Sequence, residues 1–165
     1  MARDTLELLA RRMGACLKKR KLKLVTAESC TGGWIAQAVT SVSGSSGWFD
    51  RGFVTYSDEA KKELLGVRER TLSRHGAVSR ETAEEMAAGA LARSRAQVSI
   101  AVTGVAGPTG GTKAKPVGTV CFAWSRKRRA IGSDTRRFRG GRDSVRRQSV
   151  AFALKGLLER LEETG

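Results

Sequence analysis

A serine in a turn of small residues is the first candidate for chemistry in this sequence. Ser29 lies where a short predicted strand ends and a helix predicted over 34–40 begins. Unpaired backbone N–H groups and the positive end of the helix dipole at such a turn favour a developing oxyanion. Gly32 and Gly33 would let a substrate approach the main chain closely. The alternative interpretation is that Ser29 or Thr31 only caps the helix.

A serine nucleophile needs a base, and the single histidine, His75, lies in a predicted loop where such side chains are usually solvated. Lys61 is the other candidate, because a buried lysine can lose its proton near neutral pH. Tyr56, at the end of the preceding predicted strand, would relay protons between Lys61 and Ser29 or hold both by hydrogen bonds. Alternatively, Lys61 and Lys62 lie on a solvated helix face and Tyr56 is an ordinary strand aromatic.

Cys30 is a rival nucleophile, since a thiolate is intrinsically stronger than an alkoxide. The three cysteines, Cys16, Cys30 and Cys121, show no Cys-x-x-Cys spacing. We therefore expect neither a disulfide framework nor a zinc site, and reduced thiols of a cytoplasmic protein. The proposed chemistry requires no metal and no cofactor.

A glycine-rich loop over 103–112 follows a predicted buried strand over 98–102. Its main-chain N–H groups would cradle a phosphate or a carboxamide. The spacing fits neither a Walker loop nor a dinucleotide fingerprint. Arg142, which opens the last predicted helix, would grip a phosphate with its planar guanidinium. The alternative there is a helix start aided by Asp143, with solvated arginines.

Strands and helices must alternate to position these residues. Helices are predicted from Asp4 to Leu17, over 34–40, from Asp58 to 65, from Ser79 to 91 and from 142 to 162, with Asp4, Asp58 and Ser79 as N-terminal caps. Strands are predicted over 22–25, 52–56, 98–102, 117–124 and 130–138. A turn at 126–129 is predicted to join the last two strands. This order predicts one three-layer α/β/α domain over 1–165 with a mixed sheet. Ser29, Tyr56 and the loop over 103–112 would meet at one sheet edge, at strand carboxyl ends.

The formal net charge of the 165-residue chain is +15, which permits two interpretations. One is a basic surface for an anionic ligand or nucleic acid, and the other is a solvated arginine-rich surface. We favour the second for most of the charge, so nucleic-acid binding would be non-specific if present. No apolar run is long enough to span a membrane, and the first 23 residues lack the apolar core of a secretory signal.

Five segments together resemble the CinA C-terminal domain family, the nicotinamide-nucleotide amidases. They are 27–33, 52–57 with Lys61, 103–108, 115–120 and 138–142, in order along nearly the whole chain. The stretch 112–115 is more basic than is usual in the family. The resemblance implies an α/β/α fold and hydrolysis of the carboxamide of nicotinamide mononucleotide to nicotinate mononucleotide and ammonia.

The resemblance also implies roles for particular residues. The family's Ser-Tyr-Lys set falls on Ser29, Tyr56 and Lys61. The residues expected to contact substrate are Glu28, Cys30, Thr31, Gly32, Gly33, Thr103, Gly104, Ala106, Gly107 and Arg142. The expected partners are a small nucleotide substrate and further copies of the chain, with no membrane. The alternative functions are a non-enzymatic anion- or nucleic-acid-binding module, or an inactive family member with a role in competence or DNA damage.

Overall fold

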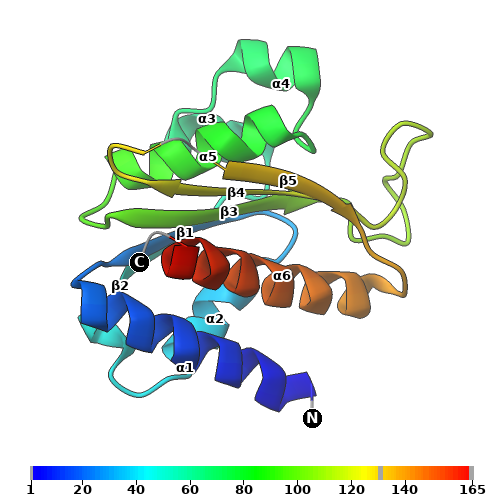
Figure 1. Ribbon diagram of the computed structural model, residues 1–165. Helices are drawn as coiled ribbons and strands as arrows, with labels where there is room; N and C mark the ends of the chain where they lie inside the picture. The colour runs from blue at the N-terminus through cyan, green and yellow to red at the C-terminus, as the bar shows by residue number, and fades with distance from the viewer. Residues whose placement is uncertain (1, 130–131, 164–165) are drawn as a thin grey trace.

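The protein, described here from a computed structural model over residues 2–129 and 132–163, contains a five-stranded mixed sheet with helices on both faces (Figure 1). The elements in chain order are α1 (Ala2–Arg20), β1 (Leu24–Glu28), α2 (Trp34–Thr40), the 3₁₀ turn η1 (Ser45–Gly47), β2 (Phe49–Val54), α3 (Asp58–Leu65), α4 (Glu69–His75), α5 (Arg80–Ala92), β3 (Val98–Gly104), β4 (Thr119–Arg126), β5 (Gly132–Arg137) and α6 (Arg142–Glu163). The predicted three-layer α/β/α fold is confirmed.

The sheet order β2-β1-β3-β4-β5 determines where the loops meet. β1 is parallel to both β2 and β3, whereas β4 and β5 are antiparallel additions. The carboxyl ends of β1, β2 and β3 therefore lie at one edge of the sheet, as predicted. The segments after Glu28, Val54 and Gly104 emerge side by side at this edge.

The two faces of the sheet carry side chains of different size. Large residues such as Leu24, Ile100 and Phe122 face α1, α2 and α6, whereas small ones such as Ala27 and Ala101 face α5. Alternation along each strand separates the two sets. The small side chains on the second face let α5 pack close to the sheet. The two cores therefore differ in the size of the sheet side chains that they contain.

Close packing of α3 on α5 fixes the height of α3 above the sheet. Gly89 of α5 lies against the carbonyl of Leu65, and a Cβ at Gly89 would stand 1.9 Å from that oxygen. No side chain fits in that space. The helix that carries Lys61 is thereby held against the layer that covers the small face of the sheet.

Most predicted elements are present, with four corrections. The helix over 34–40 and the helix from the Ser79 cap are confirmed. Asp4 is not a cap, because α1 begins at Ala2. Ser57, not Asp58, caps α3, and its hydroxyl accepts a hydrogen bond from the Ala60 N–H. His75, predicted to lie in a loop, instead ends a short helix, α4.

The remaining correction concerns strand ends. β2 spans Phe49–Val54 and so ends before Tyr56, which belongs to the connection to α3. The turn at 126–129 is confirmed, with Arg129 N–H donating to the Arg126 carbonyl. The predicted start of the last strand, 130–131, lies outside the described residues. Within the described chain, no helix has the length and apolarity that crossing a membrane requires.

Candidate active site

Ser29 is held in the turn between β1 and α2 by its own backbone. Its N–H donates to the Val102 carbonyl at 3.0 Å, which ties the turn to β3, and its carbonyl accepts from the Gly32 N–H at 3.0 Å. The residue is 7% exposed. The Ser29 hydroxyl does not cap α2, so the capping alternative does not describe it.

Lys61 reaches the Ser29 hydroxyl from α3. Its Nζ donates to Ser29 Oγ at 3.0 Å, to the Thr55 carbonyl at 2.8 Å and to the Tyr56 carbonyl at 3.2 Å. The side chain is 1% exposed, and burial lowers the pKa of Lys61 below its ordinary value of 10.5, against the opposing charge of Asp58. An amine in this setting is closer to neutral at physiological pH than one on the surface.

The neighbouring lysine shows the opposite behaviour. Lys62 points outward and pairs with Glu59 at 2.8 Å and Glu69 at 2.7 Å. Adjacent positions on a helix face different directions, so one turn of α3 buries Lys61 but leaves Lys62 half-buried, with its amine paired to surface carboxylates. Between the two interpretations of this pair, the solvated-face one therefore holds for Lys62 and not for Lys61.

The carboxylate of Glu28 accepts hydrogen bonds from within the turn and from the start of α2, so it is not available to a ligand. It accepts from Thr31 Oγ1 at 2.6 Å and from the N–H groups of Ile35 at 2.8 Å and Ala36 at 3.0 Å. A buried carboxylate at a helix N-terminus satisfies the donors that the helix leaves unpaired. The carboxylate predicted to contact substrate is thus committed to the first turn of α2, together with the Thr31 hydroxyl.

The backbone of the turn leaves donors available. Gly32 and Gly33 have φ values of +58° and +102°, which favour glycine. Among the described residues, the N–H groups of Cys30, Thr31 and Gly33 have no backbone acceptor. Backbone N–H groups without a backbone acceptor, in the turn that carries Ser29, are candidates for binding an oxyanion.

Cys30 is a buried thiol packed in the core under α2. Burial raises its pKa to about 12, so the thiolate is scarce at neutral pH. His75, the single histidine of the chain, lies on α4, where its Nδ1 is 3.7 Å from the carboxylate of Glu81. The geometry favours the serine over the cysteine.

Tyr56 does not lie where the sequence analysis expected it. The residue is 64% exposed, and its hydroxyl accepts from Arg142 at 3.4 Å instead of contacting Ser29 or Lys61. The part of Tyr56 that contacts the Lys61 amine is its backbone carbonyl, not its hydroxyl. The displacement follows from β2 ending at Val54, which leaves Tyr56 in an open connection.

Arg142 links the two sides of the site. It lies at the start of α6, and besides the Tyr56 hydroxyl it donates to the Gly107 carbonyl at 2.8 Å. The Thr103 hydroxyl donates a hydrogen bond to the Ala77 carbonyl at 2.9 Å. Gly104 ends β3, and Ala106 is buried. The backbone of this loop, rather than its side chains, faces the Arg142 guanidinium.

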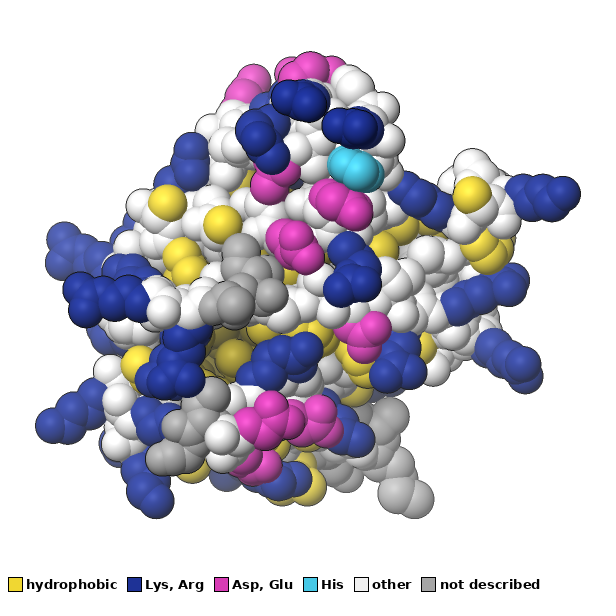
Figure 2. All heavy atoms as spheres, turned by 45° about the horizontal axis from the view of Figure 1, so that its top comes forward, with side chains coloured by type: hydrophobic (Ala, Val, Ile, Leu, Met, Phe, Trp, Pro, Cys, Tyr) yellow, Lys and Arg dark blue, Asp and Glu magenta, His cyan; other side chains and the backbone are white. Residues whose placement is uncertain are grey.

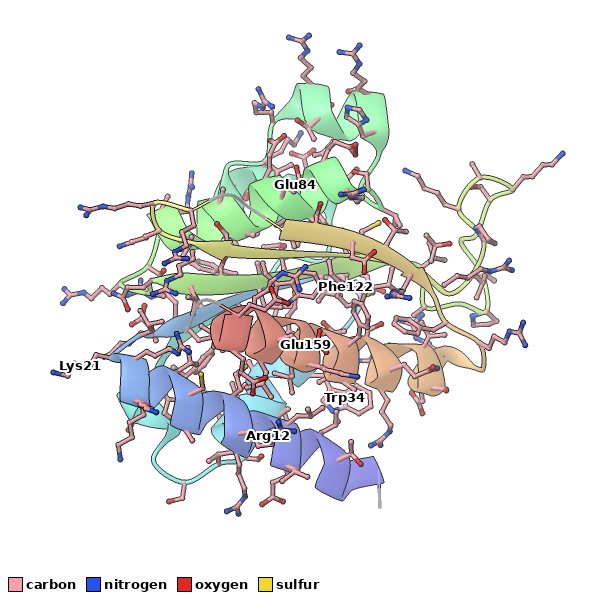
Figure 3. The ribbon with its side chains drawn as sticks, viewed as in Figure 1. Arg12, Lys21, Trp34, Glu84, Phe122 and Glu159 are labelled. Carbon is pink, nitrogen blue, oxygen red and sulfur yellow. The ribbon has the colours of Figure 1, made fainter. Side chains whose placement is uncertain are left out.

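Arg146 is a site residue that the sequence analysis missed. It donates to the carbonyls of Cys30 at 3.1 Å and Thr31 at 3.2 Å, and its guanidinium lies over the Trp34 ring, labelled in Figure 3. It follows Arg142 by four positions, so both lie on one face of α6. That spacing is the signal available in the sequence, and it places a second guanidinium on the turn that carries Ser29.

These features have counterparts in known proteins. Residues 6–161 match the sequence profile of the CinA C-terminal domain. The chain belongs to the CinA C-terminal domain family. In this CinA family, the nicotinamide-nucleotide amidohydrolase PncC of Escherichia coli strain K12 is 52% identical over 149 residues, covering 90% of each chain. The PncC of Pseudomonas putida is 51% identical over 156 residues, covering 94% of this chain and 97% of the relative.

A solved CinA-family structure has the same fold. The competence/damage inducible protein CihA of Agrobacterium tumefaciens is 47% identical and superposes with a TM-score of 0.92 over 96% of both chains. As for a metal, the described residues contain no group of three or more His, Cys, Asp or Glu side chains able to hold one.

Proposed function

We propose that this protein hydrolyses the carboxamide of nicotinamide mononucleotide, giving nicotinate mononucleotide and ammonia. The observation that carries the proposal is the 3.0 Å contact between Ser29 Oγ and the buried Nζ of Lys61. Relatives about half identical over nearly the whole chain are named nicotinamide-nucleotide amidohydrolases, which supports this substrate. On this proposal, residues 1–165 form one amidohydrolase domain that uses no cofactor.

The first half of the reaction forms an acyl-enzyme. Neutral Lys61 accepts the Ser29 hydroxyl proton while Oγ bonds to the carboxamide carbon. The carbonyl π electrons move to oxygen, and N–H groups among Cys30, Thr31 and Gly33 stabilise that charge. The protonated amine then gives its proton to the amide nitrogen as the C–N bond breaks. Ammonia leaves, and the acyl group remains as an ester on Ser29.

The second half repeats the same proton transfers with water. Lys61 takes a proton from the water as its oxygen attacks the ester carbon, and returns one to Ser29 Oγ as the C–O bond breaks. Because burial lowers the Lys61 pKa, the amine can serve as base in both halves. The carbonyls of Thr55 and Tyr56 keep Nζ pointed at Ser29 throughout.

The substrate phosphate needs a cation outside this pair. We propose that Arg142 and the backbone of the loop over 103–111 hold it, because a guanidinium binds phosphate through two parallel hydrogen bonds. Tyr56, in contact with Arg142, then lines the mouth of the site. Its phenol is our proposed contact for the ribose phosphate or the pyridine ring, rather than a relay next to Lys61.

Three substrates test the proposal. Ammonia release is measured with nicotinamide mononucleotide, free nicotinamide and the intact dinucleotide. We expect turnover of the mononucleotide and little or none of nicotinamide, which lacks the phosphate. Absence of turnover with all three would instead support an inactive family member or a binding module.

Two further expectations accompany the proposal. We propose a cytoplasmic location, supported by three free cysteines. We also propose that the chain forms a homo-oligomer, which light scattering of the purified protein tests directly.

A further inference from the structure

Basic side chains from distant parts of the sequence gather at the sheet edge opposite the Ser29–Lys61 pair. They come from the end of α1 and the turn after it, from the starts of β2 and β3, and from the β4–β5 hairpin. We call this set the basic edge; its members are Lys18, Lys19, Arg20, Lys21, Lys23, Arg51, Arg95, Arg126, Lys127, Arg128 and Arg129. All are exposed except Arg20 and Arg126, which are half-buried.

Hydrogen bonds hold the segments of the basic edge together. The side chain of Gln97 accepts from the Lys23 N–H at 2.8 Å, and its backbone N–H donates to the Lys23 carbonyl at 3.0 Å. The Gln97 carbonyl accepts from the Lys127 N–H at 2.9 Å. Gln97 therefore joins the turn after α1 to the hairpin, so the two basic clusters form one rigid surface.

Positive charge on this surface is concentrated enough to be self-repulsive. Burial lowers the pKa of Arg126, and the nearby charges of Arg129 and Arg20 lower it further. Asp50, the carboxylate next to Arg51, is occupied by Arg51 at 2.8 Å and by the Arg95 N–H at 3.0 Å. Glu163, at the end of α6, lines the same hollow as Arg126 and Arg129. The carboxylates near the basic edge are thus far fewer than its cationic side chains.

Two members of the basic edge adopt a backbone conformation that disfavours their side chains. Lys21 and Arg128 have φ values of +56° and +66°, and among the described residues they are the non-glycine positions with positive φ. Glycine or asparagine would relax both turns. Lys21 projects from the end of α1, as Figure 3 shows. Lys21 and Arg128 thus occupy their turns at a cost in backbone strain, which replacement by glycine would relieve.

The dimensions of the basic edge suit a double helix. Arg51 lies in β2, Lys23 and Gln97 directly precede β1 and β3, and Arg126 ends β4. These four strands are neighbours in the sheet, and three strand spacings of about 4.8 Å make a row of about 14 Å. A duplex carries one charge per ~1.7 Å of axis, or about eight over that length. Figure 2 shows basic side chains projecting along this side, at the left. The exposed large apolar residues, Leu8, Val54, Tyr56 and Leu64, are not members of the edge.

We propose that the basic edge binds double-helical nucleic acid through its phosphates and without sequence preference. Trp124 lines the same hollow as Arg126 and Arg129 but is only 3% exposed, which disfavours binding by base stacking. Binding to a membrane surface normally needs an exposed apolar face beside the charges, whereas the large apolar side chains next to Arg126 and Arg129, such as Leu157 and Leu161, are buried. Because the Ser29–Lys61 site opens at the other edge of the sheet, duplex binding leaves it accessible.

The test uses the full chain and a duplex of about 20 base pairs with random sequence, in a fluorescence anisotropy titration. With four to six phosphate contacts, affinity falls about 10²- to 10³-fold between about 50 and about 200 mM salt. The variant Lys21→Gly/Arg128→Gly removes two charges and relieves two strained turns. We expect it to bind at least about tenfold more weakly at low salt, with a salt slope smaller by about two. Its melting temperature should equal or exceed that of the wild type.

The matched control is Arg70→Gln/Arg74→Gln, which removes the same charge from exposed positions on α4. We expect it to bind the duplex as the wild type does. Equal losses in both variants, or no loss in the glycine variant, would overturn the proposal. Tighter binding to phosphatidylglycerol vesicles than to the duplex would also overturn it, in favour of a membrane surface.

Discussion

The side-chain nitrogen of Lys61 lies 3.0 Å from the hydroxyl of Ser29, although 32 positions separate the two residues. β1 ends one residue before Ser29, and the first turn of α3 carries Lys61. The parallel pairing of β1 and β2 brings these segments together. The proposed nucleophile and its proposed base thus come from two consecutive β–α units of one sheet.

The first prediction concerns the pH dependence of catalysis. Only neutral Lys61 can accept the Ser29 proton, so kcat/KM should rise with pH as the amine deprotonates. Because burial lowers this pKa, the midpoint should fall below the ordinary lysine value of 10.5. A pH–rate profile with nicotinamide mononucleotide measures it. A flat profile through neutral and alkaline pH would contradict Lys61 as base.

The second prediction concerns the pH dependence of stability. The folded-state pKa of Lys61 is lowered, so between that value and 10.5 the unfolded chain binds more protons than the folded one. The free energy of unfolding should therefore rise with pH through this window, and the cost of burying the charged amine is fully present below it. In Lys61→Met this contribution is absent.

Urea unfolding of both proteins at a series of neutral to alkaline pH values tests this sign. The difference in unfolding free energy between wild type and Lys61→Met should shift in favour of the wild type as pH rises. A difference that does not vary with pH would show that Lys61 titrates normally. The same variant should lose about 10²- to 10⁴-fold in kcat, the usual contribution of a general base.

Tyr56→Phe separates the two roles considered for the phenol. The hydroxyl contacts Arg142 and not the Ser29–Lys61 pair, so its loss should raise KM and change kcat only a few-fold. Steady-state kinetics with the mononucleotide provide both constants. A fall in kcat as large as that of Lys61→Met would restore Tyr56 to the proton-transfer path.

Arg146→Lys tests the guanidinium that holds the nucleophile turn. Lysine keeps the charge but cannot reach the carbonyls of Cys30 and Thr31 together, so the turn should lose order. We expect kcat to fall about tenfold, equivalent to ~1.4 kcal/mol, with KM little changed. Arg147→Lys is the control, because Arg147 also lies over the Trp34 ring. Equal effects in both variants would indicate a general loss of packing.

Sequence patterns predicted the parts of the site that local signals specify. The helix over 34–40 agrees with α2 at both ends because glycines precede it and an apolar face runs through it. The placement of Ser29 and the glycine-rich loop at one edge followed from strand order along the chain. The resemblance to the family then singled out Lys61 over Lys62, a choice that periodicity alone left open.

Tertiary contacts decided what the sequence could not. α4 is seven residues long with Thr71 and Leu72 as its buried members, too short a pattern to distinguish from a loop. The Tyr56 ring turned outward because β2 ended two residues earlier. Glu28 looked like a ligand contact, but its carboxylate satisfies the first turn of α2. The local sequence around α4, Tyr56 and Glu28 does not predict any of these three results.

The most direct measurement is ammonia release from nicotinamide mononucleotide by Ser29→Ala beside Cys30→Ala, each with its melting temperature. Removal of the Ser29 hydroxyl should abolish release while the fold persists, since among the described residues its hydrogen-bond partner is the Lys61 amine. Removal of the buried Cys30 thiol, whose pKa is about 12, should leave kcat within a few-fold at some cost in stability. Undiminished release by folded Ser29→Ala, or its loss in folded Cys30→Ala alone, would contradict a serine nucleophile activated by a buried lysine.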